Sequence, residues 1–573
     1  MRSRRGVTSR HPRPLVASAA LLAVLGALPV VAVIGRGLAL DAGGTWSHLL
    51  DTVLPRYVGN TIALVLMVGL GVGVGGTAAG WLVARRRFPG SGFFAWALLL
   101  PLAMPAYVMA YAYTDFLQYA GPVQTALREA FGWSRNDYWF PEIRSLPGAA
   151  AMFVFTLYPY VFLLARTAFV ERSPTLIEAA RTLGLDRRAA FLRVELPLAR
   201  PAIVGGVALA LMETLADFGT VAYFAVDTFT TGVYRAWFSL GDRTAAAQLA
   251  AMLLVFVVAA VALERASRGD SRTFDSARGR SGATRPPPRL TGVRAWLATG
   301  VCAIPLLAGF VIPVALLVRL LVADGDPAWT GRYAAWAYNS LRVAAIAALL
   351  AVAIAIFVAY ARRLAPGAIT RASERVLNLG YALPGTVLAI GVLLPLGVLD
   401  QAIGRAWSAL TGAGPQLFLT GTIVALVYAY LVRYFAVAWN GIEPGLARIT
   451  PAMDAAARSL GSNAWQVLRR VHVPLLARSS AAALLLVFVD VMKELPATLV
   501  LRPFNFDTLA TQTYLFAKDE RLAEAALPSL TIVAVGIVPI LVLSRIAAAR
   551  RAAGRASGRA AALPSPPRDV AAG

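Results

Sequence analysis

Charged residues are scarce in this chain. Only 15% of its 573 residues are Asp, Glu, Lys or Arg, whereas 58% are hydrophobic and the mean hydropathy is +0.65. A soluble protein carries about 25% charged residues, so this composition argues against a soluble fold. The sequence therefore predicts an all-α protein that crosses a lipid bilayer many times.

Cysteine and histidine are almost absent. The single cysteine, Cys302, lies inside an apolar run, which excludes a disulfide framework and a thiolate metal site. The three histidines, His11, His48 and His472, are too far apart in the sequence to show a metal-ligand spacing. We therefore expect no fixed metal site and no cofactor bound by this chain.

Motifs of enzymes are missing as well. The chain has no Gly-x-x-x-x-Gly-Lys-Ser/Thr loop for nucleotides, no His-Glu-x-x-His pair and no Gly-x-Ser-x-Gly elbow. A membrane-embedded enzyme is disfavoured because there is no histidine cluster and no nucleophile with an adjacent base. We expect a protein that is not an enzyme.

Acidic residues are outnumbered by basic ones, and the formal net charge is +24. The arginines lie in loops between apolar runs, which is typical of topology determinants and disfavours a nucleic-acid surface. Their distribution places both termini in the cytoplasm. We expect twelve spans, near residues 15–34, 58–84, 93–118, 148–170, 200–222, 245–263, 296–318, 339–361, 377–398, 417–440, 478–500 and 525–545.

A stretch rich in arginine and proline separates two hydrophobic halves. Its composition cannot bury a core, which predicts a flexible cytosolic linker. We therefore divide the chain into a first transmembrane domain at 1–264, the linker at 265–294, a second transmembrane domain at 295–548 and a disordered cytosolic tail at 549–573.

One pattern occurs twice, once in each half. Residues 174–198 and 451–475 follow the same plan at an offset of 277, with ten identical positions among 25. In each copy a hydroxyl residue followed by proline predicts a helix start, and Gly184 or Gly461 predicts the helix end in a left-handed conformation. Each copy is therefore predicted to be a helix-turn-helix on the cytosolic side.

The second short helix of each copy has its own signals. Asp186 in the first copy, and Ser462-Asn463 in the second, can cap its start. We expect the helix to end at Leu196-Pro197 and at Val473-Pro474.

These residues resemble the cytoplasmic coupling motif of binding-protein-dependent ABC importer permeases. The first copy carries the full pattern in Glu178, Ala179, Ala180, Gly184, Val194, Leu196 and Pro197. The second copy carries Asp454, Ala456, Ala457, Gly461 and Pro474, but Ala455 stands where the pattern has glutamate. This departure leaves open whether the second copy forms a salt bridge to its ATPase.

The resemblance implies two homologous six-helix permease halves fused in one chain of a bacterial inner membrane. It also implies two copies of a cytosolic ATPase subunit, which would bind ATP and Mg, and a periplasmic substrate-binding protein. Transport would proceed by alternating access, as the ATPase subunits rock the halves around a central path.

Four carboxylates lie inside predicted spans. Glu213 and Asp217 are four residues apart, and Asp490 and Glu494 occupy the same places in the second half, again at an offset of 277. Four-residue spacing predicts one shared helix face in each half. Because intramembrane carboxylates usually face a cavity or a partner, we treat these four as a candidate translocation path for a cation. The alternative is that Lys493 or loop arginines neutralise them.

Three further stretches, 216–224, 230–237 and 493–511, resemble the fused permeases of bacterial ferric iron importers. That resemblance implies ferric iron as the cargo. Fused permeases for thiamine or a phosphonate are similar and remain alternatives. A rival from another class is an ion-coupled secondary transporter, which would have no ATPase to dock at the repeated cytosolic motif.

Overall fold

The computed structural model describes residues 13–39, 45–171, 179–268, 288–323, 331–414 and 416–561. Within these ranges the chain is helical, and the one extended pairing is a single bridge between Arg87 and Arg289. The all-α fold predicted from composition is therefore confirmed.

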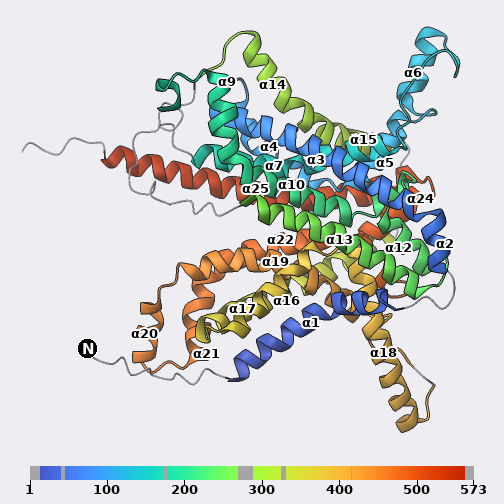
Figure 1. The fold of residues 1–573 in the computed structure, drawn as a ribbon, viewed down its shortest axis with the longest axis vertical. Helices are drawn as coiled ribbons and strands as arrows, with labels where there is room; N and C mark the ends of the chain where they lie inside the picture. The colour runs from blue at the N-terminus through green and yellow to red at the C-terminus, as the bar shows by residue number, and fades with distance from the viewer. Residues whose placement is uncertain are drawn as a thin grey trace, which may run out of the picture.

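Most first-half helices run roughly alongside one another (Figure 1). They are α1 (Arg13–Gly37), α2 (Thr45–Thr52), α3 (Leu54–Arg85), α4 (Ser91–Ala97), η1 (Leu100–Ala103), α5 (Ala106–Leu117), α6 (Pro122–Phe131), α7 (Leu146–Glu171), α9 (Arg187–Ala190), the π-turn η2 (Phe191–Glu195), α10 (Leu196–Ala216), α11 (Gly219–Tyr223), α12 (Phe229–Phe238) and α13 (Arg243–Arg268).

The second half repeats this order. Its elements are α14 (Val293–Leu306), the π-turn η4 (Leu307–Val311), α15 (Ile312–Ala323), α16 (Gly331–Leu364), α17 (Ala368–Asn378), η5 (Leu379–Ala382), α18 (Gly385–Thr411), α19 (Ile423–Ala447), α20 (Pro451–Ser459), α21 (Ala464–Val467), the π-turn η6 (Leu468–His472), α22 (Val473–Met492), α23 (Pro496–Leu501), α24 (Leu509–Lys518) and α25 (Leu522–Ala561).

Eleven described helices are long and apolar enough to cross a membrane. The pair Ser91–Ala103 and Ala106–Phe131, bent by 90°, gives a twelfth span if it is counted as one. The predicted number of spans therefore agrees with the structure.

The continuous span predicted at 93–118 is wrong, because the chain breaks at Met104-Pro105. Met104 is extended, with φ −93° and ψ 111°, and the residue before a proline is disfavoured in the helical region. The same break occurs at Leu383-Pro384, where ψ of Leu383 is 125°. The span predicted at 377–398 therefore begins late, as α18 at Gly385.

The spans predicted at 200–222 and 478–500 also end early. Helix α10 stops at Ala216 and α22 stops at Met492, and each is followed by a short separate helix, α11 or α23. Asp217 is extended, with ψ 138°, which ends the helical hydrogen-bond ladder. These breaks place irregular backbone where the two halves meet.

The two halves exchange their first spans. Helix α1 packs on α17 and α18 of the second half, and α14 and α15 pack on α3, α4 and α5 of the first (Figure 1). The Tyr428 hydroxyl donates to the carbonyl of Leu25, and the Tyr113 hydroxyl donates to that of Ala308 at 2.7 Å. Each half is therefore covered in part by a helix of the other half.

The predicted linker and tail need correction at their edges. Residues 265–268 form the last turn of α13, and Leu290 donates its N–H to the Arg87 carbonyl at 2.8 Å. Residues 269–287 of the predicted linker lie outside the described ranges. Helix α25 continues through Ala561, so the tail predicted as disordered from residue 549 is helical up to that point. Residues 562–573 lie outside the described chain.

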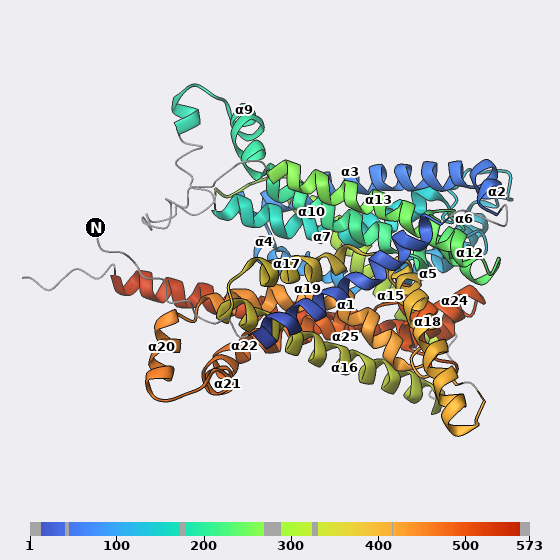
Figure 2. The same ribbon diagram turned by 60° about the horizontal axis from the view of Figure 1, so that its bottom comes forward.

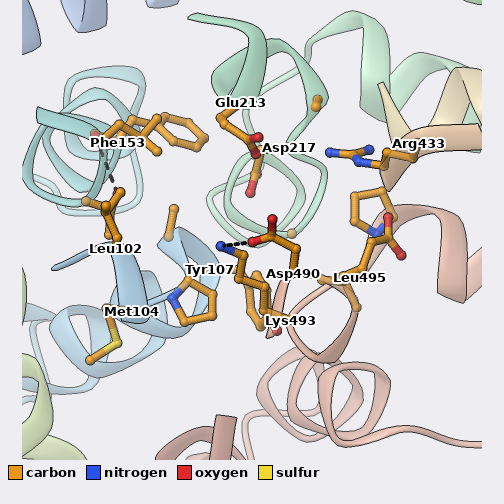
Figure 3. A pocket seen from close by; sticks show the side chains of 18 of the residues that line it. Leu102, Met104, Tyr107, Phe153, Glu213, Asp217, Arg433, Asp490, Lys493 and Leu495 are labelled. Carbon is orange, nitrogen blue, oxygen red and sulfur yellow. Dashed lines mark hydrogen bonds and ion pairs between the residues drawn. The ribbon is translucent and has the colours of Figure 1, made fainter. Parts of the chain in front are cut away.

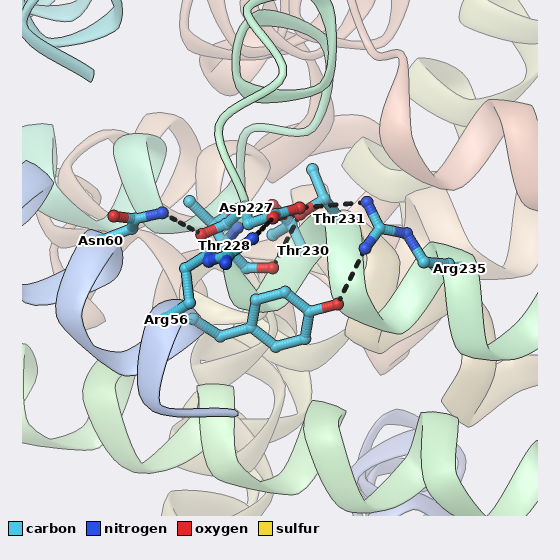
Figure 4. Close-up of polar contacts among 8 residues, drawn as sticks. Arg56, Asn60, Asp227, Thr228, Thr230, Thr231 and Arg235 are labelled. Carbon is cyan, nitrogen blue, oxygen red and sulfur yellow. Dashed lines mark hydrogen bonds and ion pairs between the residues drawn. The ribbon is translucent and has the colours of Figure 1, made fainter. Parts of the chain in front are cut away.

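A polar cluster fixes the end of the first half at which α12 begins (Figure 4). The Asp227 carboxylate pairs with Arg235 at 3.0 Å and with Arg56 at 3.4 Å, and the Asn60 amide donates to the Asp227 carbonyl at 2.8 Å. The second half repeats the last contact, since Asn339 donates to the Asp507 carbonyl at 3.0 Å. These repeated residues therefore hold α3 to α12, and α16 to α24.

Candidate translocation cavity and coupling elements

A cavity of about 110 Å³ lies between the halves, and all four predicted path carboxylates line it (Figure 3). Glu213 lies near the end of α10 and Asp217 directly after it, while Asp490 lies near the end of α22 and Glu494 two residues after that helix. The repeat therefore brings equivalent positions of the two halves to one space. We retain these four residues as a candidate path.

Two of the carboxylates are paired across short distances. Asp490 forms an ion pair with Lys493 at 2.9 Å. Glu213 accepts a hydrogen bond from the Tyr381 hydroxyl of the second half at 3.0 Å. The alternative in which Lys493 neutralises a carboxylate is thus correct for Asp490.

The other two carboxylates cap short helices. Asp217 accepts the Thr220 N–H at 2.8 Å, at the start of α11. Glu494 accepts the N–H groups of Ala497 at 2.9 Å and Thr498 at 3.0 Å, at the start of α23. The expected shared helix face of Glu213 and Asp217 is wrong, since Asp217 lies beyond the helix. The side chains of Glu213 and Asp217 nevertheless both line the cavity.

Arg433 and Tyr107 are among the polar cavity residues that sequence reasoning missed. Arg433 of α19 is only 6% exposed, and its Nε and Nη1 have no hydrogen-bond partner. Tyr107 of α5 is 4% exposed, and its hydroxyl also lacks a partner. A charge inside the span predicted at 417–440 was the available signal for Arg433, because intramembrane charges are rare. No comparable signal marks Tyr107.

We call the repeated stretches 174–198 and 451–475 the first and second coupling elements. The structure describes the first of them from Ala179 onward, so Glu178 lies outside the described residues. Gly184 has φ +93°, which confirms the predicted left-handed end. The N–H of Leu185 bonds to the Ala180 carbonyl at 3.1 Å, as in a Schellman ending. Asp186 accepts the Ala189 N–H at 2.6 Å, so its predicted capping role is also confirmed.

The second coupling element has the same geometry. Gly461 has φ +84°, and the N–H of Ser462 bonds to the Ala457 carbonyl at 3.1 Å. Asn463 caps the next helix by accepting the Gln466 N–H at 2.9 Å. Thr450 stands at the predicted start of α20, but its hydroxyl makes no capping bond, so that part of the prediction is wrong.

The second motif helix does not end at its proline, contrary to the prediction. Helix α9 passes through η2 into α10, and α21 passes through η6 into α22, so Pro197 and Pro474 lie in the first turn of the long helices. Proline has no N–H to donate, and a π-turn precedes it in both halves. Each coupling element is therefore continuous with a helix that reaches the cavity.

Asp454 is 6% exposed and is held by two residues of the second half. Its carboxylate accepts from Arg363 at 2.7 Å and bonds to His472 at 2.7 Å. Of the motif alanines, Ala180 is buried, whereas Ala179 and Ala456 are exposed and Ala457 is half-buried. The side chains of Leu183 and Leu460, at equivalent positions, are each 85% exposed.

Both coupling elements project from the same end of the molecule. Figure 2 shows α9 and α20 at that end, together with the first turn of α1 and the last turns of α25. Helices α12 and α24 lie at the opposite end. Both coupling elements are therefore accessible from one end of the molecule.

A family model matches this chain twice, at residues 76–268 and 351–551, which cover more than half of it. The model describes the binding-protein-dependent transport system inner membrane component. The chain belongs to this family. It is a multi-pass inner-membrane permease of the ABC type, with two permease domains fused in one polypeptide. Its relatives are permeases and not enzymes.

The permease is similar to several curated proteins. It is 24% identical to the Fe(3+)-transport system permease protein FbpB 2 of Haemophilus influenzae, over 91% of this chain and 96% of the relative. It is 25% identical to the putative ferric transport system permease protein FbpB 1 of the same species, over 79% and 71%. The sulfate transport system permease protein CysT of Salmonella typhimurium is 29% identical, over 32% of this chain and 64% of the relative.

Asp454 should hold α20 of the permease in place. Burial raises the pKa of Asp454, but the hydrogen bonds from His472 and Arg363 outweigh it, so the pKa lies below its usual value. A carboxylate with a depressed folded pKa stabilises the fold above the usual value of about 4, and this contribution is lost as the pH falls through the folded pKa. At neutral pH the interaction is therefore fully present.

We expect Asp454→Asn to loosen α20 by about 1–3 kcal/mol, because Arg363 and His472 lose a charged acceptor in a buried place. Amide hydrogen exchange across residues 451–461 should become roughly tenfold faster or more, since about 1.4 kcal/mol corresponds to a factor of ten. Arg458→Ala, at an exposed position of the same helix, is the matched control and should leave the exchange unchanged. Equal exchange in all three proteins would contradict a clamping role.

Proposed function

We propose that this permease imports ferric iron, with energy from two cytosolic ATPase subunits and cargo from a periplasmic binding protein. The observation that carries the proposal is the match to a ferric permease along nearly the whole chain, combined with four carboxylates in one cavity between the halves. Ferric iron is a hard cation, and carboxylate oxygens suit such ions.

The size of the cavity supports a small cargo. Its volume of about 110 Å³ is below the roughly 300 Å³ at which pockets for drug-sized ligands begin, so the described state favours an ion over thiamine. The second candidate cargo is an oxyanion. It is supported by the similarity of a single half to a sulfate permease and by the arginine and lysine that face the cavity.

The coupling elements are proposed to receive the ATPase subunits. Leu183 and Leu460 are equivalent, large and exposed, and exposed apolar side chains mark protein contacts when they recur in a defined place. Helices α10 and α22 run from these elements to the carboxylates without interruption. A push at the coupling end would therefore move the cavity walls. ATP and Mg would be bound by the partner ATPase and not by this chain.

The proposed orientation follows from the same arrangement. The coupling elements, the start of α1 and the end of α25 share one end of the molecule (Figure 2). An ATPase is cytosolic, so this end, with both termini, would face the cytoplasm. The opposite end would receive the binding protein in the periplasm.

We expect Leu183→Ser combined with Leu460→Ser to reduce co-purification of the ATPase at least fivefold. Burying a leucine side chain contributes about 1.5–3 kcal/mol to the free energy of association, and each of the two substitutions removes one such contact. The comparison is Leu240→Ser, because Leu240 is 54% exposed at the opposite end. Full retention of the ATPase by the double variant would refute docking at these positions.

The cargo is tested by uptake of radioactive iron into cells that express the permease together with a cognate ATPase and binding protein. We expect ATP-dependent uptake of ferric iron and none of radioactive thiamine or phosphonate. Sulfate uptake without iron uptake would favour the oxyanion alternative. Uptake that persists without the ATPase would indicate a secondary transporter.

A further inference from the structure

Arg433 lines the central cavity, and two of its hydrogen-bond donors have no acceptor among the described residues. Arg433 lies in α19 and is 6% exposed, its guanidinium carbon lies 5.8 Å from the centroid of the Tyr434 ring, and its Nε and Nη1 have no hydrogen-bond partner among the described residues. Figure 3 shows its guanidinium directed toward the side of the cavity where Glu213 and Asp217 lie. A guanidinium stays charged in proteins, so this is a buried, permanent positive charge.

Among the described residues, no carboxylate of the cavity accepts a hydrogen bond from Nε or Nη1 of Arg433. Glu494 already accepts hydrogen bonds from Ala497 and Thr498, and Asp490 is paired with Lys493. Asp217 accepts from Thr220, and Glu213 accepts from Tyr381. Two unpaired guanidinium nitrogens in a buried place are costly, because they lose their hydration and gain no hydrogen bonds in return. A ligand that accepts those hydrogen bonds would remove the cost.

The position is specific to one half. The residue equivalent to Arg433 in the first half, 277 positions earlier, is Thr156, which also lines the cavity. The Thr156 hydroxyl is used locally, since it donates to the Met152 carbonyl at 2.6 Å. The residue equivalent to Lys493 is Ala216. The positive side of the cavity therefore comes from the second half alone, and the duplicated fold does not require it.

A glycine leaves space beside the guanidinium. A Cβ on Gly385, the first residue of α18, would lie 2.9 Å from Nη1 of Arg433 and 2.8 Å from Oε1 of Glu494. Any larger side chain would have to displace one of these groups. The absence of a side chain at Gly385 therefore allows Arg433 and Glu494 to keep their positions at the cavity.

We propose that Arg433 binds a small oxyanion in the central cavity. The guanidinium fork matches the paired oxygens of carboxylate, sulfate and phosphate groups. The cavity volume of about 110 Å³ fits a small ion. The proposal rests on the proposed function only in taking the cavity as the cargo's path. The oxyanion is either the cargo itself or an anion that accompanies the iron.

Binding can be measured on the purified full-length permease in lipid nanodiscs, by calorimetric titration with sulfate or phosphate at constant ionic strength and with chloride as the reference. We expect one equivalent of oxyanion to bind the native protein, with at least tenfold weaker binding in Arg433→Gln. Arg433→Lys should retain part of the affinity, because it keeps the charge and loses the fork.

The matched control neutralises an arginine that does not line the cavity, as Arg319→Gln, whose guanidinium pairs with Asp115 at 2.7 Å. This change leaves Arg433 and the other cavity residues in place, so oxyanion affinity should stay within about threefold of native. Failure of the native protein to bind either oxyanion would overturn the proposal, as would equal binding by Arg433→Gln. The first of these outcomes does not depend on whether any variant folds.

Transport distinguishes the two sources of the anion. Uptake of radioactive sulfate or phosphate without iron would identify the anion as the cargo. Iron uptake that rises when either oxyanion is supplied, and does so less in Arg433→Lys, would identify an accompanying anion. Oxyanion binding without iron uptake would reject ferric cargo and keep the Arg433 site. Iron uptake by a permease that binds no oxyanion would reject the site alone.

Discussion

Replacing Asp217 with Asn and Glu494 with Gln together should lower specific uptake of ferric iron at least tenfold. Two unit charges 4 Å apart interact by about 4 kcal/mol at an effective dielectric constant near 20, so losing two carboxylates weakens attraction for a multiply charged cation. The amide oxygens can still accept part of the capping hydrogen bonds at Thr220 and Ala497. We expect a loss of only about 1 kcal/mol in stability from the weakened caps. Uptake of radioactive iron, divided by the amount of folded permease, is the measurement.

Asp400→Asn provides the matched control for that experiment. Asp400 is fully buried in α18, away from the cavity, and accepts the N–H groups of Phe418 and Leu419 at 2.8 Å each. Its loss should reduce the amount of folded permease while leaving uptake per folded molecule unchanged. If the double variant behaves in the same way, the carboxylates are structural caps and not part of the path.

Valine at both Gly184 and Gly461 should uncouple ATP hydrolysis from transport. These glycines have φ +93° and +84°, and a Cβ at either position would meet no atom within 4 Å. The cost is therefore conformational, about 1–2 kcal/mol at each position, and it is larger for a β-branched residue. Relief of this strain would turn the following helix, which is continuous with α10 or α22, and would misplace the ATPase contact.

The number of iron ions imported per ATP hydrolysed measures this effect, and we expect it to fall at least fivefold. Gly412→Val is the matched control, because Gly412 has φ +69°, ends α18 beyond the cavity and also leaves its Cβ position open. It should carry similar strain without a change in the coupling ratio. A native ratio in the Gly184 and Gly461 variant would contradict a coupling role.

Local signals of the coupling elements were predictable from the sequence. Gly184 and Gly461 end their helices in the left-handed region, and Asp186 and Asn463 cap the next ones, because these features depend on residues within a few positions. The continuation through Pro197 and Pro474 was not predicted. Proline at a helix start and proline after a helix end look alike in sequence, and the π-turn that joins the helices has no recognised residue pattern.

Long-range features were harder to predict. The exchange of α1 and α14 between the halves depends on packing such as that of Gly391 against Pro29, and the repeat alone cannot reveal it. The repeat offset of 277 residues indicated that the four carboxylates share one site, and all four line one cavity. The capping roles of Asp217 and Glu494 were not predicted, because they depend on the ends of α10 and α22 at Ala216 and Met492. Arg433 was missed because the repeat does not mark its position, since the equivalent residue of the first half is Thr156.

Movement of the halves can be tested at a contact between them at the end of the molecule opposite the coupling elements. Arg144, before α7 of the first half, pairs with Glu520, before α25 of the second, at 3.4 Å, and the side chains are 35% and 74% exposed. Cysteines at both positions can be joined by a reducible thiol cross-linker, because the native Cys302 is fully buried. The single-cysteine variants, treated in the same way, are the controls.

The decisive measurement is ferric iron uptake by this cross-linked permease, reconstituted with its ATPase and binding protein. Alternating access requires the outer ends to separate so that cargo can enter. The account predicts that the cross-link stops uptake, that reduction restores it, and that both single-cysteine variants transport normally throughout. Uptake at the native rate while the outer ends are joined would contradict it.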